Sequence, residues 1–84
     1  MKRFSSTVSK DQMILQRFGL NVKTERSNQN LSLEDFSKLS GISETIIYQI
    51  EAGEIDVNIS VASMLAKKLK VDLIRLFDFD QSKM

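Results

Sequence analysis

The stretch 31-LSLEDFSKLSGISETIIYQIEAG-53 contains two short amphipathic segments with a glycine between them. Ser32 precedes Asp35 by three residues, which is the spacing of a helix-capping box, and Gly41 ends the first segment as a left-handed C-cap glycine would. Ser43 is a suitable N-cap for the second segment. Two short helices joined by such a turn form a helix-turn-helix. This pattern alone has modest specificity, because many short helical hairpins share it.

Apolar residues on both sides of this stretch recur at helical spacing. They predict a first helix that begins near Ser9 and ends near Arg26, a fourth helix over residues 59–70 with Asn58 as its N-cap, and a short fifth helix over residues 71–79. The sequence therefore predicts an all-α domain of five helices. The apolar residues expected to build its core are Leu15, Phe18, Val22, Phe36, Leu39, Ile42, Ile47, Ile50, Ile59, Ala62, Leu65, Ala66, Leu69, Val71, Leu73, Leu76 and Phe77.

The chain of 84 residues has the length of one small domain, and its 42% hydrophobic and 27% charged residues are typical of a soluble globule. We expect a flexible N-terminal arm (1–10), a helix-turn-helix domain (11–79) and a polar C-terminal tail (80–84). No apolar stretch approaches the roughly 18 residues of a membrane helix, and the arm has no apolar stretch of the kind found in a signal peptide. We therefore expect no membrane association and a cytoplasmic location.

The chain has no cysteine and no histidine. Their absence excludes disulfides and thiol chemistry, most zinc sites and the commonest general base. Because the carboxylates show no pairing in the sequence either, we expect no catalytic residues, no metal site and no cofactor. The net charge of +1 is less positive than that of many nucleic-acid-binding domains and does not by itself favour such a function.

Seven pieces of sequence, in order, carry a resemblance over residues 18–77: "VKTER", "LSLEDFSKLSG", "IS", "II..IEAG", "NISVASMLAKKL", "VDL" and "LF". In their order and spacing they resemble the lambda repressor and Cro-like family of DNA-binding proteins, also called the Xre family. Within that family, the length and the "FG..V...R" opening are most similar to the restriction–modification controller proteins. The resemblance implies a compact five-helix, lambda-repressor-like domain with its helix-turn-helix at helices 2 and 3.

The resemblance also implies a function. Helix 3 of such a domain lies in the major groove of double-stranded DNA, and a homodimer binds a pseudo-palindromic operator with half-sites about one turn of DNA apart. We therefore expect a bacterial or phage-encoded transcription regulator, a repressor or autoregulator, that associates with the nucleoid when bound. The chain has no room for a ligand-sensing domain, so no small-molecule ligand is expected.

Residues at three places in helix 3 read base edges in this family, and here they are Glu44, Thr45 and Gln49. Glutamate can accept from the cytosine amino group, glutamine can bind adenine, and threonine can touch a thymine methyl. None makes the common arginine–guanine contact, so we expect an operator not dominated by guanine at these places. Tyr48 should point outward towards DNA. The alternatives are that Glu44 only interacts with the helix dipole and that the Tyr48 ring lies on the domain surface.

Phosphate contacts are expected mainly from helix N-termini, whose free N–H groups bind anions without charged side chains. Ser32 and Ser43 mark two such ends. Leu33 stands where the family usually has a glutamine that touches phosphate, so only its backbone N–H can take that part. Lys38 is the best candidate for a charged contact, although a solvated surface role is favoured for each lysine taken alone. Further candidates are Lys2, Arg3, Lys10 and Lys23.

The resemblance implies a structural ion pair between Arg26 and Glu51, which would fix helix 3 against helix 1. Ile74, Phe77 and Phe79 are apolar residues near the C-terminus that suit a two-fold interface, as in the family. The alternative is that they only close the core.

A second class of function stays open, a protein-interaction module on the same fold that has lost DNA binding. It is motivated by acidic residues in and after helix 3 that no basic residue there compensates, namely Glu44, Glu51, Glu54 and Asp56.

Overall fold

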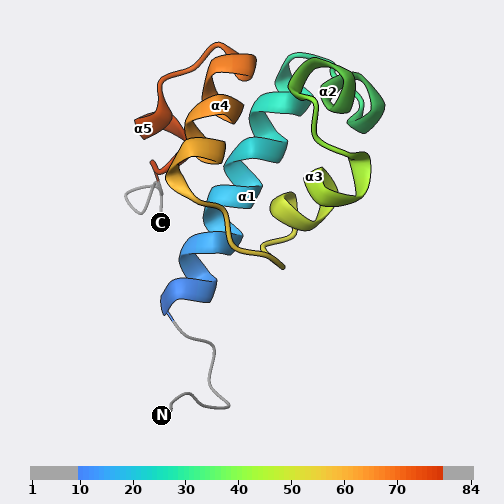
Figure 1. The fold of residues 1–84 in the computed structure, drawn as a ribbon. Helices are drawn as coiled ribbons and strands as arrows, with labels where there is room; N and C mark the ends of the chain where they lie inside the picture. Colours follow the sequence, from blue (N-terminus) through green and yellow to red (C-terminus); the bar gives the residue numbers. More distant parts are fainter. Residues whose placement is uncertain (1–9, 79–84) are drawn as a thin grey trace.

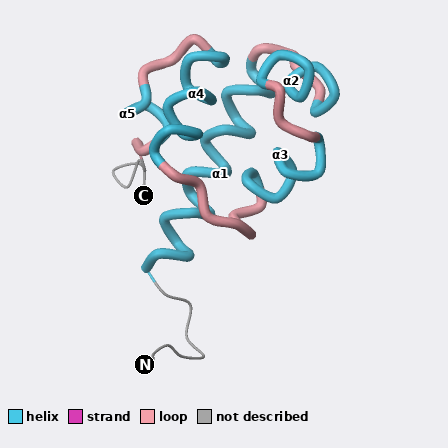
Figure 2. Tube along the Cα trace, viewed as in Figure 1, coloured by secondary structure: helices cyan, strands magenta, loops and turns pink. Residues whose placement is uncertain are grey.

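The computed structural model describes residues 10–78, which form five helices (Figure 1). They are α1 (Lys10–Asn28), α2 (Leu33–Ser40), α3 (Glu44–Glu51), α4 (Ile59–Leu69) and α5 (Leu73–Leu76). No strand occurs between residues 10 and 78 (Figure 2), so the predicted all-α class is confirmed. Most of the expected arm, the expected tail, Ser9 and Phe79 lie outside the described residues.

Helix α1 is the long central element, with α2 and α3 to one side of it and α4 and α5 to the other in Figure 1. It contacts α3, α4 and α5, while α2 contacts α3 and α4. The helix-turn-helix formed by α2 and α3 is thus packed directly against the rest of the domain.

Local capping chemistry explains where three helices begin. The Ser32 hydroxyl accepts from the Asp35 N–H at 2.9 Å, and the Asp35 carboxylate accepts from the Ser32 N–H at 3.2 Å, which completes a capping box. The hydrogen bond from the Ser32 backbone lowers the pKa of Asp35 below its usual value. Ser43 and Asn58 cap α3 and α4 with one side-chain hydrogen bond each, from the N–H of Ile46 and of Val61, so the predicted starts of all three helices are confirmed.

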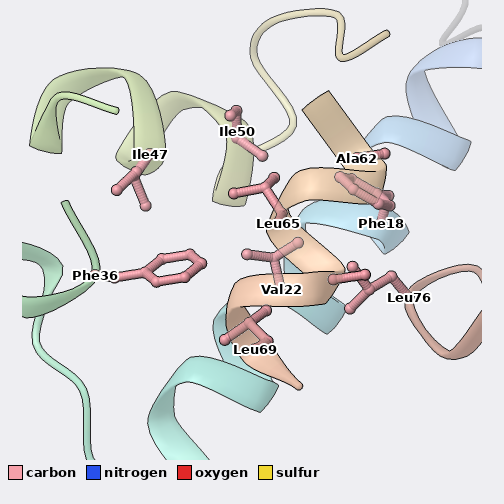
Figure 3. Close-up of a cluster of buried hydrophobic side chains, with 10 residues drawn as sticks. Phe18, Val22, Phe36, Ile47, Ile50, Ala62, Leu65, Leu69 and Leu76 are labelled. Atoms are coloured by element: carbon pink, nitrogen blue, oxygen red, sulfur yellow. The ribbon is translucent and has the colours of Figure 1, made fainter. Parts of the chain in front are cut away.

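The core contains side chains from every helix (Figure 3). Phe36 is the buried residue of α2 and Leu76 that of α5, and both pack into the same cluster. The buried residues are Phe18, Val22, Phe36, Ile47, Ile50, Ala62, Leu65, Ala66, Leu69 and Leu76. All ten were predicted, while Ile42, Val71 and Leu73 are partly buried against them and Leu15 is partly buried on α1.

Two predicted core residues are wrong, and a third, Phe77, is 37% exposed at the end of α5. Leu39 is 46% exposed and Ile59 is 65% exposed. At about 100° per residue, Leu39 lies about 110° from the mean direction of the inward residues of α2, which include two serines. Ile59 is the first residue of α4 and lies about 70° from the centre of its buried stripe. Each side chain therefore falls on the flank of its helix.

The predicted fifth helix is shorter than expected, since α5 spans only Leu73–Leu76. The end of α4 explains the difference. Lys70 adopts a left-handed conformation, with φ of 61°, and its N–H bonds back to the carbonyls of Ala66 and Lys67. Val71 and Asp72 therefore belong to the connection between α4 and α5, and Phe77 ends the last turn.

Candidate nucleic-acid interface

The turn between α2 and α3 is fixed by two serines of α2 as well as by its glycine. Gly41 has φ of 80°, which favours glycine, and its N–H donates to the Ser37 carbonyl at 2.8 Å. The Ser37 hydroxyl donates to the Ile42 carbonyl at 2.6 Å, and the Ser40 hydroxyl accepts from the Ile42 N–H at 3.2 Å. Sequence analysis missed both serines, because it sought only apolar residues on the inward face of α2.

The outer face of α3 presents most of the predicted base-reading residues. Glu44, Thr45 and Tyr48 are exposed, whereas Gln49 is half-buried on the flank of the helix. Ile47 and Ile50 are buried on the opposite side. The structure therefore brings the first three side chains together on one free surface and places Gln49 at its edge.

The C-terminal end of α3 is joined to α1 by a nearly buried ion pair. Arg26 donates from Nε to Glu51 Oε2 at 2.7 Å and from Nη2 to Oε1 at 3.0 Å. The two side chains are only 12% and 5% exposed. Arg26 also donates from Nη1 to the Leu31 carbonyl at 2.7 Å, so it connects α3 to the segment before α2. The hydrogen bonds to Glu51 raise the pKa of Arg26 above its ordinary value.

Two glycines allow close backbone contact at the same end of α3, and sequence analysis assigned neither to that purpose. A Cβ on Gly19 would overlap the Ile50 carbonyl oxygen and lie 2.7 Å from the Glu51 carbonyl oxygen. Gly53 has φ of 73°, and a Cβ there would lie 2.7 Å from the Gln16 Cα. For Gly19, the only signal in the sequence was that a glycine stands within an apolar helical stretch.

The helix-turn-helix is acidic. Residues 32–58 contain one basic residue, Lys38, and six carboxylates: Glu34, Asp35, Glu44, Glu51, Glu54 and Asp56. Lys38 lies 3.3 Å from Glu34 in an exposed ion pair, which is the weak kind. The exposed lysines Lys67, Lys68 and Lys70 lie instead around the end of α4.

The predicted interface residues around α5 differ in exposure. Ile74 is 77% exposed, whereas Phe77 is 37% exposed and its ring centroid lies 4.9 Å from that of Phe18. Phe77 therefore helps to cover the core, while Ile74 has a free apolar side chain. Both line a shallow surface pocket together with Lys70, Val71, Asp72, Arg75 and Asp78.

Within residues 10–78 no group of three or more His, Cys, Asp or Glu side chains is arranged to hold a metal ion. Over the same residues, no helix combines the length and the apolar character that crossing a membrane requires.

Comparison with known families gives a match over most of this domain. The model of the helix-turn-helix family HTH_3 matches residues 22–76, which include α2, the turn and α3. No curated protein sequence matches the chain.

The solved structures that are similar to the chain include the following three. An HTH_3 family transcriptional regulator from Vibrio cholerae superposes with a TM-score of 0.79 and 27% identity over 88% of this chain. The chain spans only 42% of that regulator's length. The restriction–modification controller protein C.AhdI from Aeromonas hydrophila superposes with a TM-score of 0.71 and 28% identity. The match covers 75% of this chain and 96% of the controller protein.

The third structure is the hypothetical transcription factor NHTF from Neisseria, with a TM-score of 0.78, 18% identity, and coverage of 96% of this chain and 93% of its own. At that identity it supports the fold alone. The three superpositions support the helix-turn-helix fold that the sequence resemblance implied.

Proposed function

The chain belongs to the helix-turn-helix family HTH_3, and from that premise we propose that it is a sequence-specific regulator of transcription that binds double-stranded DNA. It acts as a cytoplasmic repressor or autoregulator. A homodimer places α3 of each subunit in the major groove of a pseudo-palindromic operator, with half-sites about one helical turn apart.

The observation that carries this proposal is the contrast between the two faces of α3. Ile47 and Ile50 hold the helix on the core, while Glu44, Thr45 and Tyr48 are exposed on the other side. A recognition helix needs such a free outer face, because its side chains must reach base edges in the groove. Gln49, at the edge of this face, completes the proposed base-reading set.

The lack of positive charge on α3 is compatible with DNA binding if backbone groups hold the phosphates. Ser32 and Ser43 cap the first turns of α2 and α3, where further N–H groups have no partner within the helix. The N–H of Leu33 is one of these, while its side chain packs against the core. Lys38 supplies one charged contact after it leaves Glu34. These groups orient the protein without reading sequence.

We propose that the dimer forms around α5, through Ile74 and Phe77, with Phe79 as a further candidate outside the described residues. Ile74→Asp should shift sedimentation of the protein from dimer to monomer, because a charge would be buried at the interface. The matched substitution Ile59→Asp, at an exposed isoleucine outside α5, should leave the dimer intact. Identical sedimentation of Ile74→Asp and the unsubstituted protein would contradict this interface.

A second candidate function is a protein-interaction module, and the charge of the helix-turn-helix favours it. Five of the six carboxylates over residues 32–58 are exposed, against one lysine, and this excess of negative charge would repel phosphates and attract a basic partner. The structural similarity to transcription regulators makes DNA the first choice.

Fluorescence anisotropy separates the two candidates. The protein is titrated into labelled duplex from immediately upstream of its own gene and into a scrambled duplex, at several salt concentrations. Tight, salt-dependent preference for the upstream duplex is the expected result. No binding to either duplex at low salt would contradict a DNA-binding function and favour a protein partner. Equal weak binding to both would contradict autoregulation through this upstream site.

A further inference from the structure

We infer that Glu44 is a specificity-determining residue that selects cytosine and rejects guanine at one position in each operator half-site. The inference rests on the proposed function and identifies the kind of base pair that the site accepts.

Glu44 lies at the exposed N-terminal end of α3. It is the first residue of α3, it is exposed, and it lies next to exposed Thr45. The Ser43 hydroxyl accepts from the Ile46 N–H at 3.2 Å, so the first turn around Glu44 is capped and ordered. The N-terminal residues of a helix-turn-helix recognition helix contact base edges. Glu44 therefore lies where a side chain meets the floor of the groove.

No neighbouring basic side chain in the described part of the chain neutralises the charge of Glu44. Among the side chains that the structure describes, from residue 12 to residue 78, the ion pairs are Arg26–Glu51, Lys38–Glu34 and Arg75–Glu25, and Glu44 takes part in none of them. The segment from Glu44 to Glu51 has no lysine or arginine. The carboxylate would therefore enter the groove without a cation from its own helix to neutralise it.

The chemistry of the base edges then decides the preference. An ionised carboxylate can only accept hydrogen bonds. In the major groove cytosine offers the N4 amino donor, whereas guanine offers the acceptors N7 and O6. Cytosine can satisfy Glu44, but guanine would place acceptors against an acceptor in a partly dehydrated site.

Glu44 should therefore lower the affinity for DNA in general while it raises the discrimination between sequences. Its charge is repelled by every phosphate nearby and lowers affinity for all DNA. Its unfavourable contact with guanine lowers the affinity for a duplex with guanine at this position more than for one with cytosine. The discrimination between the two duplexes therefore rises. A carboxylate that served only the helix dipole would have the first effect without the second.

The experiment compares Glu44→Gln with Glu54→Gln. Both changes remove one exposed carboxylate, but Glu54 lies beyond Gly53, after the end of α3. Wild type is first used to select its preferred duplex from a randomised pool. Anisotropy then gives the dissociation constants of all three proteins for that duplex, for every single-base-pair variant of one half-site, and for scrambled DNA. Thermal unfolding checks that both variants fold.

For wild type, one cytosine-to-guanine exchange should weaken binding by about 5- to 150-fold, which is the range of a good base contact. E44Q should lose that discrimination, and its base preference at this position should shift towards adenine. It should also bind scrambled DNA more tightly than wild type does. E54Q should bind scrambled DNA more tightly with unchanged discrimination.

An unchanged base preference of E44Q at every position would overturn the role of Glu44 while leaving the proposed function in place. Failure of the wild-type protein to select any duplex would overturn the proposed function itself, and with it the basis for this inference.

Discussion

The two ends of α3 differ in what holds them. The C-terminal end is anchored by the Arg26–Glu51 ion pair and by the close approach of Gly19 to the last carbonyls of the helix. The N-terminal end is held by the Ser43 cap and the two serine hydrogen bonds to Ile42, and its side chains are exposed.

Under the proposed function, this difference separates the residues that position α3 from those that read the DNA sequence. Groups at the C-terminal end set where α3 lies but do not face the solvent, so they have no direct means of reading sequence. Side chains in the first turn are exposed and bear little of the packing, so they are free to vary in chemistry. Changes at the first end should affect stability and binding to all DNA alike, and changes at the second end should mainly affect sequence preference.

The largest effect is expected for Glu51→Ala. It leaves the guanidinium of Arg26 nearly buried without its carboxylate, which should lower the free energy of unfolding by about 3–5 kcal/mol. Urea unfolding measures this change. The control is Glu54→Ala, an exposed carboxylate that forms no ion pair within residues 10–78, and it should change stability by less than about 0.5 kcal/mol. Equal stability of the two variants would contradict the anchoring role.

A smaller effect, with an informative sign, is expected for Gly19→Ala. Alanine normally stabilises a helix by about 1 kcal/mol relative to glycine. Here the new Cβ overlaps the Ile50 carbonyl, so α1 and α3 must separate and stability should fall by about 1–3 kcal/mol instead. The melting temperature gives the sign, and Thr24→Ala at an exposed site in α1 should not lower it. A higher melting temperature for Gly19→Ala would disprove the close contact.

The smallest effect is expected at the N-terminal end, for Ser43→Ala. Loss of the cap should lower the free energy of unfolding by about 1 kcal/mol, while Ser43→Gly should lower it by only a few tenths of a kcal/mol. Chemical denaturation of the two variants makes the comparison. A loss from Ser43→Ala as large as that from Glu51→Ala would mean that both ends of α3 carry the fold equally, against the separation described above.

Local sequence rules were sufficient for the starts of α2, α3 and α4 and for the ten buried residues. They depend on chemistry within one turn, as in the capping box of Ser32 and Asp35, and on the spacing of apolar residues. Leu39 and Ile59 were wrong because burial on the flank of a stripe depends on where neighbouring helices lie. A single sequence contains no such information.

Contacts between residues distant in sequence also could not be predicted from local sequence rules. The amide of Asn21 donates to the Leu76 carbonyl at 2.8 Å, and that of Gln29 donates to the Leu69 carbonyl at 2.6 Å. Nothing in the spacing of these polar residues predicts either partner. The pairing of Arg26 with Glu51 was expected only through the family resemblance.

The most direct test of the account is to map the amide chemical shifts of ¹⁵N-labelled protein as its selected duplex is added. We expect the largest shifts at the N-cap and in the N-terminal half of α3, from Ser43 to Tyr48, with further shifts at the start of α2. Shifts concentrated around the lysines at the end of α4, with α3 unaffected, would contradict it.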